Sequence, residues 1–147
     1  MGTLLSTEEL KEHALRFLKS KSLMVLGTSS NDKVWSATVY YVVTEEFEII
    51  FYSRSDTRHT ENIEINPNIS VVVTEIPIKS KKIKSIQLAG IARKADGADW
   101  NKYYLRYEEK YKWAKEFPDH IIYVVKPLEL WMIDEKLLGH FNRVQVF

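Results

Sequence analysis

The chain has 147 residues, a length that suits one domain rather than two. Hydrophobic residues make up 45% of it, enough to bury a core, which excludes intrinsic disorder. Its 21 Lys and Arg balance 20 Asp and Glu, so a net charge of +1 creates no long-range attraction to nucleic acid or to an acidic membrane.

Several kinds of chemistry are excluded by residue type and spacing. The chain has no cysteine, which removes disulfides, thiolate nucleophiles and iron–sulfur ligation. Its five glycines form neither a dinucleotide-binding turn nor a phosphate loop, and its four histidines are widely separated, so we expect no metal site. An acidic N-terminal segment and the lack of a long apolar run predict a cytoplasmic protein without signal peptide or membrane span.

The first half of the chain reads as a helix followed by short strands. Ser6 and Glu9 fit a capping box, and apolar residues at helical spacing follow, which predicts a helix over residues 7–20. Alternating and β-branched residues then predict strands over residues 23–28, 34–43 and 47–52. A second short helix is predicted over residues 57–65, where Thr57 can cap and Asn66-Pro67 ends it.

The second half continues with strands around one longer helix. We predict strands over residues 69–76, 85–93, 121–125 and 128–133, and a helix from Asp96 to about Phe117. The basic stretch of Lys79, Lys81, Lys82 and Lys84 is interpreted as a solvated hairpin end, with a phosphate patch as the alternative. The expected fold is mainly β with flanking helices (α+β), a six- to seven-stranded antiparallel split β-barrel in a single domain over residues 1–147.

The junction after the third strand is the most informative segment. Ser53 and Thr57 bring hydroxyl groups to the start of a helix, whose first backbone N–H groups are free and whose dipole favours an anion. Arg58 can bind two phosphate oxygens, and His59 can add a donor. The segment therefore suits a phosphate group, although Asp56 and Thr57 could simply cap the helix and leave Arg58 in solvent.

The same segment resembles a known family. The motifs that carry the likeness are Phe51-Tyr52-Ser53, Thr57-Arg58-His59, Asn62-Ile63 and Asn66-Pro67, followed by the β-type run from Ile69. They are similar to the core of the pyridoxamine 5'-phosphate oxidase-like family of FMN-binding split β-barrels, most of all to its small uncharacterised bacterial members. The likeness extends less sharply over most of the chain.

The resemblance implies a cofactor site for FMN. It implies that Arg58 binds the FMN phosphate with His59 in place of the family's lysine, and that Tyr52 and Ser53 contact the phosphate or ribityl chain. Further cofactor contacts are implied for Thr57, Ser36, Ala37, Thr38, Val39, Ser85, Gln87 and Trp131, with Asn142 and Arg143 as weaker candidates. Because Trp131 would reach the cofactor of the opposite subunit, the resemblance also implies a homodimer with a shared site.

Some of the oxidase's substrate contacts are missing. Trp35 and Tyr40 stand where the oxidase has Arg and Lys, and Arg143-Val144-Gln145 replaces its Arg-x-His. We therefore expect an FMN-dependent oxidoreductase acting on a small substrate that the sequence does not identify. The alternatives are a non-catalytic flavin or heme storage module on the same barrel, and a barrel that binds single-stranded nucleic acid through Tyr40, Tyr52 and the lysine-rich stretch, against which the net charge argues.

Overall fold

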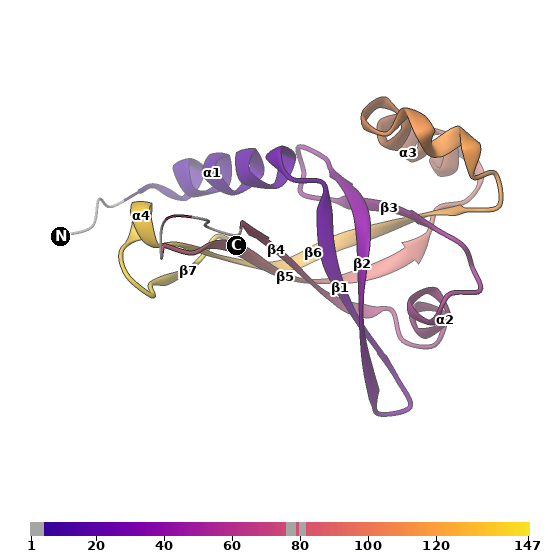
Figure 1. Cartoon of the computed structure of the whole chain (residues 1–147), viewed down its shortest axis with the longest axis horizontal. Coiled ribbons are helices and arrows are strands. Elements are labelled where there is room, and N and C mark those ends of the chain that lie inside the picture. The colour runs from indigo at the N-terminus through magenta and orange to yellow at the C-terminus, as the bar shows by residue number, and fades with distance from the viewer. Residues whose placement is uncertain (1–4, 76–78, 80–81) are drawn as a thin grey trace.

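Seven antiparallel strands form one sheet in the computed structural model, which describes residues 5–75, 79 and 82–147 (Figure 1). The strand order is β3-β2-β1-β4-β5-β6-β7, and β3 also pairs with β6. That extra pairing closes six strands into a barrel and leaves β7 outside, which confirms the predicted split barrel. The strands are β1 (Leu23–Ser30), β2 (Lys33–Val43), β3 (Ile49–Ser53), β4 (Asn68–Glu75), β5 (Lys84–Lys94), β6 (Ile121–Asp134) and β7 (Arg143–Gln145).

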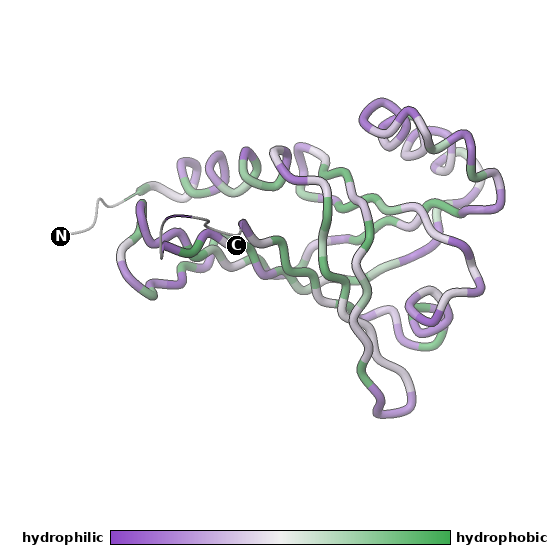
Figure 2. The backbone as a smooth tube through the Cα atoms, in the orientation of Figure 1, coloured by the Kyte–Doolittle hydropathy of each residue, from purple (hydrophilic) through white to green (hydrophobic). Residues whose placement is uncertain are grey.

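Four α-helices accompany the sheet within the described residues: α1 (Thr7–Ser20), α2 (Arg58–Ile65), α3 (Gly97–Lys110) and α4 (Glu135–Leu138). The capping box of α1 is confirmed, because Ser6 Oγ accepts from the Glu9 amide at 3.1 Å and Glu9 Oε1 accepts from the Ser6 amide at 3.2 Å. The apolar residues of α1 repeat at helical spacing (Figure 2), and its buried side chains pack on the barrel core. None of these helices is long and apolar enough to cross a bilayer.

Two hydrophobic clusters lie on opposite sides of β3. Phe51 points into the barrel and stacks on Tyr123 with ring centroids 5.1 Å apart. Tyr52 points the other way, into a second cluster under α3, where its hydroxyl donates to the Phe117 carbonyl at 2.8 Å. Because all five residues of β3 are buried, the strand separates the two clusters and holds the chain rigidly up to Ser53.

Three predicted elements, two strands and a helix, are wrong in extent. The strands predicted over residues 121–125 and 128–133 are one strand, β6, because Pro127 lies at an irregularity in the β5–β6 pairing, opposite Gly90, where its missing N–H is tolerated. The helix predicted from Asp96 to Phe117 ends at Lys110, and a 3₁₀ turn follows over Lys112–Glu116. Tyr111 is the C-cap, with the non-helical backbone angles φ −117° and ψ 85°, and its hydroxyl donates to the Tyr41 carbonyl at 2.6 Å.

Other boundaries agree to within two residues, apart from two short elements that the sequence did not predict. These are α4 and β7, which follow β6 and return the chain to its outer edge. The predicted end of the fourth strand at Ile76 and the position of Lys81 lie outside the described residues. The hairpin end and its alternative, a phosphate patch, therefore remain predictions.

The irregularity at Gly90 yields a stability prediction. A Cβ at this position would meet the Lys126 carbonyl oxygen at 2.5 Å and Val125 Cγ1 at 2.7 Å. We expect Gly90→Ala to lower the free energy of unfolding by about 1–3 kcal/mol, as overpacking does. Urea denaturation should show this loss, whereas Ala98→Ser, which adds one atom at an exposed position, should change stability by less than about 0.5 kcal/mol. Equal effects of the two substitutions would contradict the close approach.

Candidate functional site

The junction between β3 and α2 gathers four of the predicted site residues: Ser53, Thr57, Arg58 and His59. Ser53 is buried at the end of β3, and His59 Nε2 lies 3.0 Å from its hydroxyl. Thr57 is the N-cap of α2, with its Oγ1 accepting from the Thr60 amide at 3.2 Å. The Thr60 hydroxyl donates to the Arg54 carbonyl at 2.8 Å, which ties the turn to the helix. The junction is thus a fixed turn whose polar groups lie together.

Arg58 begins α2 with its charge unpaired. No carboxylate in the described part of the chain forms an ion pair with it, and its guanidinium carbon lies 4.2 Å from the centroid of the Trp35 ring. Nor do the described residues supply an acceptor for the amide hydrogens of Arg58 and His59. The side chain is exposed, as the alternative interpretation expected, and it rests on an indole. The result is a cluster of donors without an acceptor.

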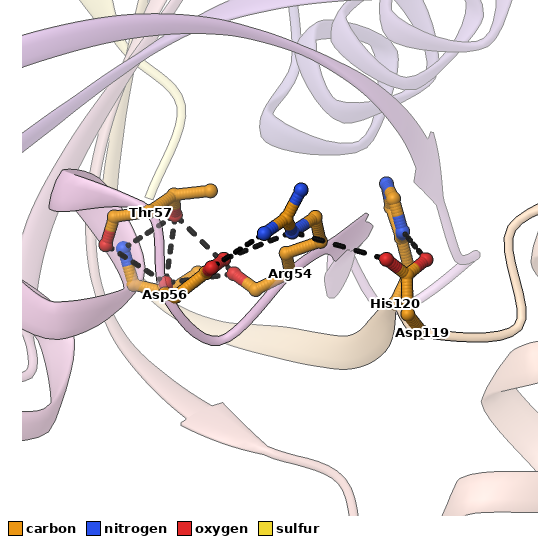
Figure 3. Close-up of polar contacts among 6 residues, drawn as sticks. Arg54, Asp56, Thr57, Asp119 and His120 are labelled. Carbon is orange, nitrogen blue, oxygen red and sulfur yellow. Dashed lines mark hydrogen bonds and ion pairs between the residues drawn. The ribbon is translucent and has the colours of Figure 1, made fainter.

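Two carboxylates near the junction, those of Asp56 and Asp119, pair with a different arginine, Arg54 (Figure 3). Arg54 donates to both oxygens of Asp56, at 2.9 and 2.5 Å, and its Nε lies 3.8 Å from Asp119. These contacts hold the pKa of Asp56 below its usual range, and a hydrogen bond from His120 does the same for Asp119. Thr57 caps α2, as the alternative interpretation expected, whereas Asp56 does not. Sequence analysis missed Arg54, although its i to i+2 spacing from Asp56 was visible.

His59 is half-buried beside the same turn. Burial lowers the pKa of its imidazole, because the charged form loses hydration and no carboxylate compensates for the loss. The ring is therefore neutral at pH 7, where the family's lysine would carry a charge. Of the two exposed arginines at this turn, Arg54 is paired with carboxylates and Arg58 is not.

One edge of β2 lies open beside the junction. The strand pairs with β1 from Lys33 to Tyr40, but β3 joins its other side only from Tyr41 onward. Residues 35–40 therefore expose unpaired backbone N–H and C=O groups along one edge in the described structure. Ser36 and Thr38 point to the outer face and are exposed, whereas Ala37 and Val39 are half-buried and share the other face with Trp35.

The outer face of the sheet carries another part of the predicted site. The registers align Thr38, Val25, Val72, Gln87 and Trp131 in one row across five strands. At about 4.8 Å per strand, Gln87 lies about 14 Å from Thr38, and Trp131 about 19 Å from it. These two residues therefore do not meet the Arg58 cluster within one chain.

The remaining candidates are engaged elsewhere. Ser85 is buried, and its hydroxyl donates to the Val73 carbonyl at 3.2 Å. The Trp131 indole donates to Glu129 at 2.6 Å, and the Asn142 amide donates to the Leu138 carbonyl at 2.9 Å. Arg143 is exposed in β7, whereas Tyr52 faces α3 on the side opposite Ser53. The structure does not bring any of these side chains to the junction.

A shallow depression at the far end of β2 was not found from the sequence. Its volume is about 350 Å³, and small residues line it: Gly27, Ser29, Ser36 and Ser70, with Trp35 at its side. A Cβ on Gly27 would lie 2.3 Å from Ser70 Oγ, so a larger residue there would have to displace the Ser70 hydroxyl. Its lining comes from β1, β2 and β4, so the depression lies on the β1 side of β2, opposite the open edge.

Comparison with known proteins decides the family. The profile of the pyridoxamine 5'-phosphate oxidase family matches residues 10–134, which is most of the chain. The chain belongs to this family. In this chain the matched region runs from α1 to the end of β6. It therefore contains both the β3–α2 junction and the open edge of β2.

Individual relatives are more distant. A UPF0306 protein of Photorhabdus laumondii is 29% identical over 83 residues, which span 56% of this chain and 58% of that protein. A heme binding protein from Mycobacterium smegmatis superimposes with a TM-score of 0.76 at 15% identity, covering 98% of this chain and 60% of the other. An FAD-binding protein from Mesorhizobium loti gives 0.70 at 16% identity, covering 88% and 93%. At such identities the structural matches establish the fold alone.

The depressed pKa of His59 predicts a pH dependence of stability. The unfolded chain takes up a proton on this ring near pH 6.5 and the folded chain only at lower pH, so the stability of the wild type should fall as pH drops below about 6.5. For one proton the slope is at most about 1.4 kcal/mol per pH unit. His59→Gln, whose amide can still reach Ser53, should flatten this part of the curve in urea titrations between pH 7 and 5. An unchanged slope would show that His59 titrates normally.

Proposed function

We propose that this protein binds FMN, with the phosphate held at the β3–α2 junction, and that it acts as a flavin-dependent oxidoreductase on a small substrate. One observation carries the proposal. Arg58 presents its donors beside the start of α2, and no carboxylate of the described chain neutralises it. A cation kept unpaired next to free amides and the Ser53 and Thr57 hydroxyls is the donor set that a phosphate monoester requires.

The strength of such a site is adequate for a cofactor. Each charge-assisted hydrogen bond contributes about 1.5–3 kcal/mol. Two from Arg58 and two from the amides of α2 would therefore support binding at about micromolar strength, after the costs of immobilising the ligand. His59, neutral at pH 7, would add a hydrogen bond and no charge.

The open edge of β2 offers a place for the ring. Backbone groups of residues 35–40 can pair with the polar edge of an isoalloxazine ring, and Ser36 and Thr38 are small enough to admit it. Trp35 lies at the Arg58 end of this edge. The phosphate of FMN would therefore lie near Trp35, and its ring would lie further along β2 toward Tyr40. Bound FMN would supply the hydride or electron chemistry, and the chain would bind it, orient it and exclude water.

Gln87 and Trp131 can join this site only from a second copy of the chain. Within one chain they lie about 14 and 19 Å from Thr38 along the sheet, too far to share one ring with Arg58. The outer face that carries them exposes apolar side chains, among them Leu23, Val25 and Tyr40. A two-fold dimer packed through this face would cover those side chains and bring Gln87 and Trp131 to the partner's cofactor.

A second candidate function is storage of a flat cofactor without turnover. The likeness in fold to the Mycobacterium smegmatis heme binding protein favours testing it. Absorption spectra after addition of FMN or hemin distinguish the two ligands. Reduction of bound FMN by NADH or NADPH then separates an oxidoreductase from a storage protein: reduction with turnover supports the first function, and bound FMN that no donor reduces supports the second.

The phosphate assignment predicts a selective loss of affinity. Arg58→Ala should weaken FMN binding at least about tenfold, since it removes two charge-assisted hydrogen bonds, and should leave the weaker binding of riboflavin unchanged. Quenching of flavin fluorescence on binding measures both affinities. Arg106→Ala is the matched control, because this half-exposed arginine of α3 pairs with Glu45 in the turn between β2 and β3. Unchanged FMN affinity in Arg58→Ala would remove the phosphate from this junction.

The dimer predicts a link between assembly and binding. Val25 lies in the outer row between Thr38 and Val72 and is 43% exposed, so Val25→Arg places a charge in the proposed interface. We expect monomers by analytical ultracentrifugation and at least about tenfold weaker FMN binding, whereas Leu105→Arg on the exposed face of α3 should change neither. A Val25→Arg protein that remains dimeric, or a monomer that binds FMN normally, would contradict the shared site.

A further inference from the structure

Trp35 holds Arg58 without using any of its hydrogen-bond donors. The guanidinium carbon lies 4.2 Å from the centroid of the indole ring, within the range of a cation–π contact. Trp35 comes from β2, where it pairs with Thr28 and is 42% exposed, and Arg58 comes from the first turn of α2. The contact therefore joins the two elements that border the proposed cofactor site, 23 positions apart in the sequence.

For phosphate recognition it matters that Arg58 is positioned by an aromatic ring and not by a carboxylate. A guanidinium that a carboxylate positions gives up two in-plane donors and much of its charge to its partner. A guanidinium that an aromatic face positions keeps all five N–H groups around its rim available. Stacking on Trp35 thus restricts the Arg58 side chain, which otherwise has large rotamer entropy, and leaves its donors for a ligand.

The neighbouring carboxylates also leave the donors of Arg58 available. Asp56, two residues before Arg58, is the carboxylate closest to it in sequence, and both of its oxygens are bound by Arg54. Arg54 also lies 3.8 Å from Asp119, which comes from the loop before β6. In Figure 3 these carboxylates converge on Arg54. Asp56 and Asp119 are therefore occupied, Glu61 in the first turn of α2 forms no ion pair with Arg58, and Arg58 has only the ring as a partner among the described residues.

We propose that Trp35 is a positioning residue that presents Arg58 to a phosphate dianion, and that selectivity of the site for phosphorylated ligands depends on this ring. The proposal deepens the proposed function and rests on it for the identity of the ligand as FMN. The contact itself and its effect on free phosphate do not depend on FMN. Trp35 needs no direct contact with the ligand to play this part.

A first experiment tests the contact with inorganic phosphate alone. In nitrogen-15-labelled protein the Arg58 Nε–H signal, assigned by its loss in Arg58→Ala, should be shifted upfield by the indole ring current. Trp35→Leu should abolish the shift and weaken phosphate binding at least about threefold, whereas Trp35→Phe should keep part of both, in the order of cation–π strength. Trp100→Leu is the matched control, since Trp100 stacks on Tyr104 and holds no cation. An Arg58 signal or a phosphate affinity unchanged in Trp35→Leu would overturn the proposal.

A second measurement compares FMN with riboflavin in the same variants. Trp35→Leu should lower the ratio of FMN to riboflavin affinity at least about threefold, and should have no further effect on FMN once Arg58 is alanine. Equal weakening of both ligands would mean that the ring packs against the flavin instead, which overturns the proposal. If the wild type binds phosphate in a Trp35-dependent way but binds no FMN, the positioning role is supported and the proposed function fails. Thermal unfolding of each variant confirms that it is folded.

Discussion

The double pairing of β3 is the constraint on which this structure depends. β3 pairs with β2 over Ile49–Phe51 only and with β6 along its whole length, Ile49–Ser53. It closes the barrel by leaving β2 early, so β2 keeps an open edge over residues 35–40. The chain that leaves the sheet at Ser53 must turn beside this edge, and the N-terminus of α2 is placed there. The pairing of β3 with both β2 and β6 therefore places the open edge of β2 next to the N-terminus of α2.

The charges at that turn are distributed between two arginines. Arg54 takes the carboxylates and ties the β3–α2 loop to the loop before β6, while Arg58 keeps its donors and stacks on an aromatic ring. Exchanging these roles would leave an ion pair where the donor cluster now stands. Since surface ion pairs add little stability, pairing Arg58 would gain little for folding, and the unpaired Arg58 is what the proposed phosphate site requires.

Local signals in the sequence account for much of the fold and for the core of the site. Capping at Ser6 and Thr57, strand alternation and Asn66-Pro67 predict α1, α2 and most strands, because each acts within a few residues. The signals fail where distant contacts decide. Tyr111, where α3 ends, bonds to Tyr41 far away in the sequence, and the Gly90 pairing keeps β6 continuous through Pro127. The direction of Tyr52 is likewise invisible, since a strand buried on both faces shows no alternation. The row that joins Thr38, Gln87 and Trp131 exists only through strand registers, which no local pattern specifies.

The most direct test is a crystal structure of the protein soaked with FMN. The account predicts the FMN phosphorus within hydrogen-bond reach of the Arg58 guanidinium and the first amides of α2, with Arg58 still lying on Trp35 and the ring running along the open edge of β2. A phosphate bound elsewhere, or an Arg58 that turns away to a carboxylate while the junction stays empty at saturating FMN, would contradict it.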